Sequence, residues 1–227
     1  MWDVYSPGSK ERLTAFDLGR FPNETLLDRV GRATCRAGCL PRKELFEAWE
    51  VARRVRRRFR GGRVIDMAAG HGLLAHVMLL LDDSSPMAVA IDTALPASSA
   101  KLHDALVESW PRLAGRIRLM SASLDSLELH ATDVIVSSHA CGAMTDVILD
   151  RAMDAGARVA VLPCCHDAET CDTGGLTGWV DPPLAIDVTR AARLQRHGYR
   201  VWTQSIPAEI TPKNRLLMGS MLEETEV

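Results

Sequence analysis

The stretch Val64-Ile65-Asp66-Met67-Ala68-Ala69-Gly70-His71-Gly72-Leu73 decides the fold class of this chain. A run of β-forming apolar residues ends in the acid Asp66, a Gly-x-Gly pair follows four residues later, and a helical pattern then runs over 73–81. Glycines at such a point let the backbone turn sharply and come close to a ligand, between the end of a strand and the start of a helix. This order is typical of the nucleotide-binding turn of a parallel α/β sheet.

Predicted strands and helices alternate on both sides of this turn. The strands are expected over 63–68, 87–92, 117–120, 133–137 and 158–162, and the helices over 73–82, 97–109, 143–154 and 185–196. Two more strands, 199–205 and 215–221, are too close in sequence for a crossover helix, so we expect them to form an antiparallel hairpin. The predicted fold is therefore a doubly wound α/β domain, with a mostly parallel seven-stranded sheet and a C-terminal antiparallel hairpin.

Residues 1–60 are predicted to form an N-terminal helical extension, and residues 61–227 the nucleotide-binding domain. Residues 1–40 are mixed and indicate a short helical or irregular segment. A helix starting at Pro41 is expected next, because four apolar residues recur on one face: Leu45, Trp49, Ala52 and Val55. The pair Gly61-Gly62 is expected to end this helix.

The composition is that of an ordinary globular chain of 227 residues, with 47% apolar and 25% charged residues. The net charge of -2 does not predict a polyanion partner, and 5% aromatic residues argue against a base-stacking sheet. We find neither a long apolar run nor a signal-like start, so we expect no membrane segment and a cytoplasmic location. The oligomeric state stays open.

One short segment is nevertheless very basic. It contains seven arginines: Arg53, Arg54, Arg56, Arg57, Arg58, Arg60 and Arg63. One interpretation is a phosphate-binding patch for nucleic acid, in which Arg54, Arg57 and Arg58 contact the substrate. The alternative is a solvated helix face whose charges complement the negative end of the helix dipole.

The six cysteines are Cys35, Cys39, Cys141, Cys164, Cys165 and Cys171. In a reducing compartment they are expected to be thiols. A metal site built from Cys164, Cys165, His166 and Cys171 is conceivable, but no paired Cys-x-x-Cys is present. We therefore predict no metal, and small buried thiols near a pocket.

The identity of the nucleotide has two interpretations. Gly70-x-Gly72-x-x-Ala75, with Asp92 twenty residues beyond Gly72, fits the fingerprint of an NAD-dependent oxidoreductase. Asp66, however, would repel a pyrophosphate and attract a sulfonium or an ammonium group. The chain also contains only one such half, and residues 121–125 offer small polar groups to an adenine. These features favour S-adenosylmethionine (SAM).

Residues 60–222 resemble the class I, Rossmann-like SAM-dependent methyltransferases. Their acid-x-Gly-x-Gly-x-Gly motif matches residues 66–72, with Ala68 in place of the first glycine. The resemblance implies SAM as the cofactor and assigns each part of it to residues of this chain. Asp66 and the backbone at Ala68, Gly70 and Gly72 would hold the methionine part, Asp92 the ribose, and Ser123 with Leu124 the adenine.

Three further segments resemble one group of these enzymes, which includes a tRNA acceptor-stem ribose methyltransferase and several methyltransferase-like proteins. The segments are Ser138 to Gly142, Thr145-Asp146, and Pro163-Cys164-Cys165-His166. A Lys/Glu-bearing helix precedes the glycine motif in this group, and Lys43, Glu44 and Glu47 match it. RNA is then the leading acceptor, while a small molecule or protein acceptor, and a non-catalytic SAM- or RNA-binding module, remain alternatives.

The acceptor side of the site is expected at the carboxyl ends of the strands. His139 and His166 follow the fourth and fifth predicted strands, so both are candidate catalytic residues, and His139 also faces the cofactor. A base with the ordinary histidine pKa of about 6.5 would give a rate that rises through that pH. Asn214 is expected to orient the acceptor, and Lys43, Lys213 and Arg215 to contact substrate. A purely structural role for each is the alternative.

Overall fold

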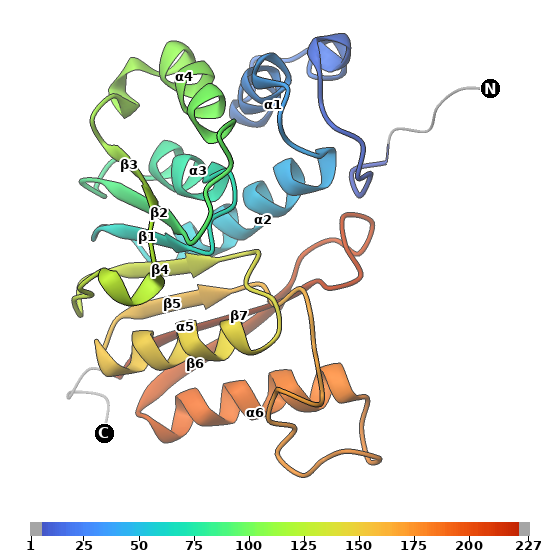
Figure 1. Cartoon of the computed structure of the whole chain (residues 1–227), viewed down its shortest axis with the longest axis vertical. Helices are drawn as coiled ribbons and strands as arrows, with labels where there is room; N and C mark the ends of the chain where they lie inside the picture. Colours follow the sequence, from blue (N-terminus) through green and yellow to red (C-terminus); the bar gives the residue numbers. More distant parts are fainter. Residues whose placement is uncertain (1–5, 223–227) are drawn as a thin grey trace.

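The computed structural model describes residues 6–222, and these form a seven-stranded sheet between two layers of helices (Figure 1). The strand order is β3-β2-β1-β4-β5-β7-β6. The strands are β1 (Val64–Met67), β2 (Ala88–Asp92), β3 (Ile117–Ser121), β4 (Val134–Ser137), β5 (Arg158–Val161), β6 (Tyr199–Ser205) and β7 (Arg215–Met221). The first five strands pair in parallel, and β7 runs antiparallel to both β5 and β6. The predicted fold class is therefore confirmed, including the hairpin.

Helices cover both faces of the sheet. On one face lie α1 (Leu26–Ala37), α2 (Arg42–Arg58), α3 (Leu73–Leu81) and α4 (Ser99–Ser109), and on the other lie α5 (Ala143–Asp154) and α6 (Pro182–Arg196) (Figure 1). Alternate strand residues point into two separate hydrophobic clusters, for example Val64 into the first and Ile65 into the second. Because both faces are covered, the central strands are apolar throughout.

The N-terminal region is more regular than the sequence predicts. Residues 26–37 form the full helix α1, which begins after Thr25, whose side chain accepts from the Asp28 N–H, and ends at Gly38 with a φ of 64°. Gly31 lies directly against the ring of Phe21, so only a residue without a side chain fits there. A larger apolar residue at this position would have made the helical periodicity visible in the sequence. Of the two alternatives that the sequence left for this region, a helical or an irregular segment, residues 26–37 take the helical one.

A second difference concerns the start of α6. The sequence predicts a start at residue 185, whereas the helix begins at Pro182. Proline suits the first turn of a helix, where its missing N–H has no partner to lose. None of the helices in the described part of the chain is long and apolar enough to span a membrane.

Helix α2 runs from one end of the parallel strands to the other. We call the side of the sheet where these strands end the carboxyl edge, and the side where they begin the amino-terminal edge. The first turns of α2 lie near the loops after β1 and β4, where Glu44 lines a small cavity with Ala69 and His139. Its last turn lies near the end of α3, where Arg56 donates to the Met78 carbonyl. A 17-residue helix spans about 25 Å. The basic end of α2 and the glycine turn are thus at opposite edges, and α2 shares one hydrophobic cluster with α3.

Candidate active site

The turn after β1 is formed by three residues in the left-handed region. The φ angles are 53° at Ala68, 54° at Gly70 and 78° at Gly72. A Cβ on Gly72 would lie 3.0 Å from the Ala90 Cβ and 3.3 Å from the Leu119 Cδ2, so this turn packs closely against the sheet. Ala68 stands where the motif has a glycine, and its left-handed backbone costs on the order of 1 kcal/mol.

Asp66 holds this turn from beneath. Its side chain is 1% exposed, and its Oδ2 accepts a hydrogen bond from the Ala75 N–H at 3.1 Å. Burial raises the pKa of this carboxyl well above its ordinary value. The carboxyl group thus connects β1 to the first turn of α3, and a direct contact of Asp66 with a methionine group stays a prediction.

Asp92 lies at the carboxyl end of the neighbouring strand. Its Oδ2 accepts from the Gly70 N–H at 3.0 Å and its Oδ1 from the Ala94 N–H at 3.1 Å. Each carboxylate oxygen has a second lone pair, so both can still accept from ribose hydroxyls. The Ala122 N–H donates to the Asp92 carbonyl at 2.9 Å, which brings the end of β3, with the exposed Ser123, next to this acid.

The first turns of α2 bring acids to the same edge. The Lys43 Nζ lies 2.9 Å from the Glu47 Oε1, and Glu44 lines the small cavity behind the glycine turn. Burial, and to a smaller extent the charge of Glu47, raise the pKa of Glu44 to about 6. From the sequence, only the resemblance pointed to this helix. The structure gives the reason, because Glu44 lines this cavity together with Ala69 and His71.

His139 lies where its position after β4 suggests. It lines the cavity with Glu44 and His71, and its Cδ2 would be 4.0 Å from a Cβ on Gly70. Burial, with smaller contributions from the charges of Lys43 and His71, lowers the pKa of His139 to about 4. The expected ordinary pKa is therefore wrong. The imidazole is neutral at pH 7 and accepts protons only weakly.

His166 and Arg215 are directed toward α6 instead. The His166 Nε2 lies 2.8 Å from the Asp187 Oδ1, and the Arg215 Nε lies 2.6 Å from the Asp187 Oδ2. The His166 side chain is 1% exposed. Both side chains thus contact Asp187 on the face of the sheet that α5 and α6 cover. Catalysis by His166 and substrate contact by Arg215 stay predictions.

Asn214 and Lys213 belong to the loop between β6 and β7, which lies at the carboxyl edge of the sheet (red, Figure 1). The Asn214 Nδ2 donates to the Ile206 carbonyl at 2.9 Å, and the Ile206 N–H donates to the Asn214 carbonyl at 2.9 Å. Asn214 therefore closes the hairpin loop. Lys213 is exposed. Acceptor contacts by these two residues stay predictions.

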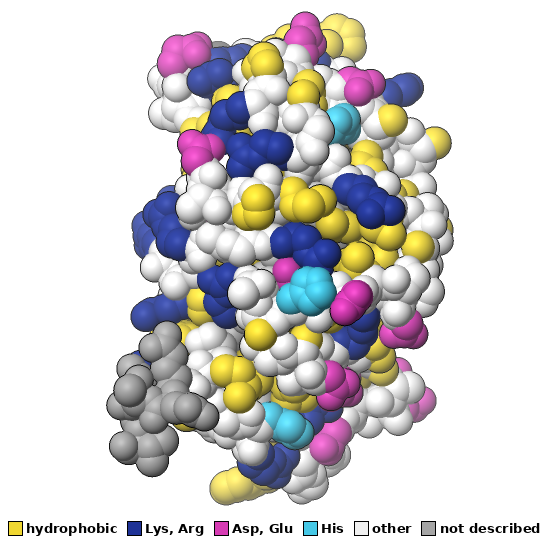
Figure 2. Space-filling view, turned by 90° about the vertical axis from the view of Figure 1, so that its left-hand side faces the viewer, with side chains coloured by type: hydrophobic (Ala, Val, Ile, Leu, Met, Phe, Trp, Pro, Cys, Tyr) yellow, Lys and Arg dark blue, Asp and Glu magenta, His cyan; other side chains and the backbone are white. Residues whose placement is uncertain are grey.

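The arginine-rich segment lies at the opposite, amino-terminal edge. Arg56 is buried against Asp82 at 3.1 Å, Arg63 pairs with Asp133 at 2.7 Å, and Arg54 pairs with Glu50. Arg57 and Arg58 are exposed, and the Arg58 guanidinium lies 4.7 Å from the Trp202 ring centroid. Figure 2 views this side of the molecule, where basic side chains lie among acidic and apolar ones. An RNA contact by Arg54, Arg57 or Arg58 stays a prediction.

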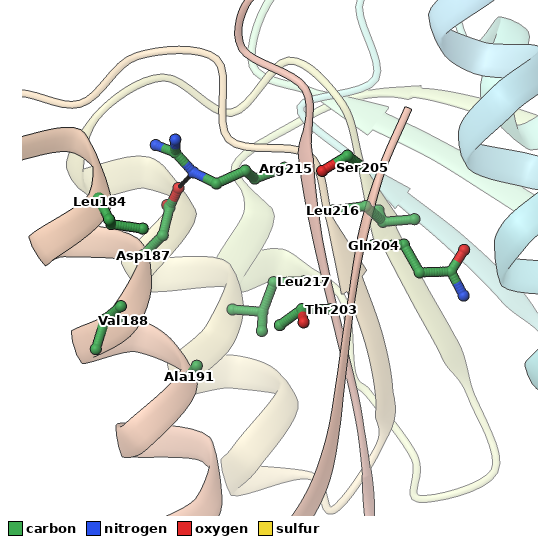
Figure 3. Close-up of a pocket in the computed structure, with 10 residues that line it drawn as sticks. All are labelled: Leu184, Asp187, Val188, Ala191, Thr203, Gln204, Ser205, Arg215, Leu216 and Leu217. Carbon is green, nitrogen blue, oxygen red and sulfur yellow. Dashed lines mark hydrogen bonds and ion pairs between the residues drawn. The ribbon is translucent and has the colours of Figure 1, made fainter. Parts of the chain in front are cut away.

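A larger cavity than the one that Glu44 and His139 line lies away from the glycine turn. It has a volume of about 450 Å³ and lies between α6 and the strands β6 and β7 (Figure 3). Leu184, Val188 and Leu217 give it apolar walls, and the Asp187–Arg215 pair lies at one end. The candidate active site is therefore identified by its chemistry and its place on the fold, and not by the size of the cavity.

Comparisons with known proteins agree with this location. The family model described as a methyltransferase domain matches residues 44–169, which is more than half of the chain. No curated protein matches. The match covers α2, the glycine turn, Asp92, His139 and the Cys164-Cys165 pair.

Solved structures of methyltransferases share the fold. An O-methyltransferase family protein from Burkholderia thailandensis is 19% identical, with a TM-score of 0.53 over 95% of this chain and 66% of that one. Mitomycin 7-O-methyltransferase is 20% identical, with a TM-score of 0.51 over 92% of this chain and 63% of that one. The chain thus spans less than two thirds of the length of these structures, and at such low identity they show the fold alone. The family model, which matches more than half of the chain, shows that this chain belongs to the methyltransferase-domain family.

Proposed function

We propose that this protein binds SAM across the carboxyl ends of β1, β2 and β3 and transfers its methyl group to an acceptor. The observation that carries the proposal is the turn of Ala68, Gly70 and Gly72 beside the Asp92 carboxylate. Side chains larger than hydrogen at Gly70 and Gly72 would need a strained backbone, so the turn presents bare peptide groups to a ligand. The geometry fits SAM, whose ribose needs an acid and whose methionine part needs a close backbone.

Different residues of the site bind different parts of SAM. Asp92 accepts hydrogen bonds from the ribose hydroxyls, while Ser123 and Leu124 border the adenine. Glu44 carries a carboxyl group whose ionisation an ammonium group would favour. Asp66 also fixes the turn, because it accepts from the Ala75 N–H. Bound SAM supplies an electrophilic methyl group, so the protein mainly has to align the acceptor, an effect worth roughly 7–11 kcal/mol in well-oriented reactions.

His139 is the proposed residue on the acceptor side. It follows β4 and lies beside Gly70, at the edge where the acceptor must approach. Its neutral imidazole can hold an acceptor hydroxyl or N–H by a hydrogen bond and receive its proton as the methyl group transfers.

We propose RNA as the acceptor, and a group of cations at the carboxyl edge supports it. Arg12 and Lys101 line a cavity of about 360 Å³ together with His71 and Ser98. Within residues 6–222, neither Arg12 nor Lys101 has a carboxylate partner within ion-pair distance. Two such cations beside the glycine turn suit a phosphate group. This cavity, unlike the arginines of α2, lies next to the proposed methyl-transfer centre.

A methyl-transfer assay tests the proposal. The protein is incubated with tritiated SAM and separate RNA, protein and metabolite fractions. We expect label in RNA, and we expect Arg12→Gln with Lys101→Gln to lower it at least tenfold. The matched control, Arg57→Gln with Arg58→Gln, should keep full incorporation. Label in the metabolite or protein fraction would support the alternative acceptors, and no label in any fraction, with SAM bound, would support a non-catalytic module.

A further inference from the structure

Three thiols from two loops meet at the carboxyl edge of the sheet. Cys141 follows β4, and Cys164 and Cys165 follow β5. The Sγ of Cys141 lies 2.9 Å from that of Cys164, which lies 3.8 Å from that of Cys165, and all three atoms are within 4.8 Å of one another. This group is hard to recognise from the sequence, because 23 residues separate Cys141 from Cys164.

The fold explains why the group forms. β4 and β5 are parallel neighbours, with Ser137 paired to Val161, so the loops that follow them leave the sheet side by side. The Gly142 N–H then donates to the Cys165 carbonyl at 3.3 Å and ties the two loops together. Cys141 and Cys165 are exposed and Cys164 is half-buried, so an ion can reach the three sulfurs from solvent.

The distances suit a tetrahedral metal ion with thiolate ligands. Zinc–sulfur bonds of about 2.3 Å at tetrahedral angles separate the sulfurs by about 3.8 Å. The Cys164–Cys165 pair already has this separation. The Cys141–Cys164 pair must open by about 1 Å, which a small rotation of the exposed Cys141 side chain achieves.

We propose that Cys141, Cys164 and Cys165 bind one zinc ion through three thiolates. In the described part of the chain, no histidine or carboxylate joins the group within the same distance. The fourth tetrahedral position is then open to water or to a thiol or other ligand from solvent. Three protein ligands with an open position are typical of reactive zinc sites, whereas structural zinc sites are closed by a fourth ligand.

The site would also fix the geometry of the acceptor side. Cys141 is two residues from His139, and the bound ion would join the loop that carries His139 to the loop after β5. This inference does not depend on the acceptor or on methyl transfer, because it rests on the three sulfurs alone.

Cobalt titration tests the proposal. The full chain is reduced, stripped of metal with a chelator, and titrated with Co²⁺, whose bonds to thiolates give a near-ultraviolet charge-transfer band that grows with the number of thiolates. We expect saturation at one equivalent, and loss of the band when one equivalent of Zn²⁺ is added. Cys141→Ser, Cys164→Ser and Cys165→Ser should each reduce the band and weaken Zn²⁺ binding at least about tenfold.

Cys171→Ser is the matched control, since Cys171 is in the same loop region but its thiol is buried beside Arg190. It should leave the band and the affinity unchanged, and circular dichroism verifies that every variant is folded. The absence of a thiolate band would overturn the proposal, as would a band that survives all three substitutions. A Cys141–Cys164 disulfide in a protein that takes up no Zn²⁺ after reduction would equally overturn it, in favour of a redox pair.

Discussion

Charged residues near the two ends of α2 have different surroundings at the two edges of the sheet. At the amino-terminal edge, Arg56 and Arg63 are paired with the buried acids Asp82 and Asp133. At the carboxyl edge, burial removes Glu44 and His139 from water. It raises the pKa of Glu44 to about 6 and lowers the pKa of His139 to about 4. Arg56 and Asp82 also have shifted pKa values, but they are paired with each other, whereas burial is the main cause of the shifts of Glu44 and His139. Desolvated groups without such a pair, and not the density of charge, therefore mark the candidate site.

The arginine-rich sequence is thus largely explained by the fold. Arg56 donates to the Met78 and Phe59 carbonyls and to Ser85, and Arg158 donates to the carbonyls of Arg60 and Thr132. These bonds satisfy backbone carbonyls where α2 and α3 end and where the chain enters β1 and β4. A basic run read from sequence alone cannot reveal how many of its charges are used in this way.

The largest effect is expected when the Arg56–Asp82 ion pair at the amino-terminal edge is removed. Arg56 is 2% exposed and Asp82 is 4% exposed. Arg56→Ala removes the closest cation of the buried Asp82 carboxylate, which keeps its bonds to Ser84 and Gly61, so the free energy of unfolding should fall by about 3 kcal/mol. Urea denaturation at equilibrium measures this, with Arg57→Ala as the exposed control. A loss below 1 kcal/mol would mean that the pair contributes little to the fold.

The second prediction concerns the carboxyl edge. His139→Ala should lower the methyl-transfer rate about a hundredfold, because it removes the proposed proton acceptor, and should change SAM affinity little. With the pKa of His139 lowered to about 4, the rate should rise with pH near 4 and stay flat through 6.5. Single-turnover rates from pH 4 to 8 measure this. Equal losses of rate and SAM affinity would instead assign His139 to the cofactor pocket.

A smaller effect is expected at Glu44. Its raised pKa means that the carboxyl group is neutral below about pH 6 and ionised above it. The ammonium group of SAM favours the ionised form, so SAM affinity should rise as pH increases through 6, by about tenfold. Glu44→Gln should remove this rise. A pH-independent affinity in the parent protein would show that Glu44 does not contact the ammonium group.

The smallest effect is expected for the exposed arginines. Arg57→Gln with Arg58→Gln should change the free energy of unfolding by no more than about 0.5 kcal/mol per site and leave SAM affinity unaltered, because both side chains are exposed at the far edge. Salt titrations of RNA binding sharpen the comparison. A lower slope in this double variant would give the amino-terminal edge a role in holding RNA.

Local signals made most of the fold predictable. The glycine turn, the alternating strands and the short connection between β6 and β7 follow from patterns within a few residues. The bounds of helix α1 did not, because Gly31 is dictated by the Phe21 ring, a contact between segments. The left-handed backbone at Ala68 was similarly hidden, since alanine rarely adopts it.

Site residues could be predicted only where their position depends on one local segment of the sequence. Asp92 and His139 follow strands, so their edge could be assigned from topology. The pKa values of Glu44 and His139, the ion pairs of His166 and Arg215 with Asp187, and the meeting of Cys141 with Cys164 all need contacts across many residues. Such contacts depend on how the loops after neighbouring strands pack, which a single sequence does not state.

Calorimetry with SAM tests the central claim most directly. We compare the parent protein with one variant from each edge, Asp92→Ala and Arg57→Gln. The account predicts that Asp92→Ala loses hydrogen bonds to the ribose worth about 1.5–3 kcal/mol, a tenfold or greater loss of affinity, while Arg57→Gln binds SAM like the parent. Equal SAM affinity in Asp92→Ala and the parent would contradict the assignment of the cofactor to the carboxyl edge.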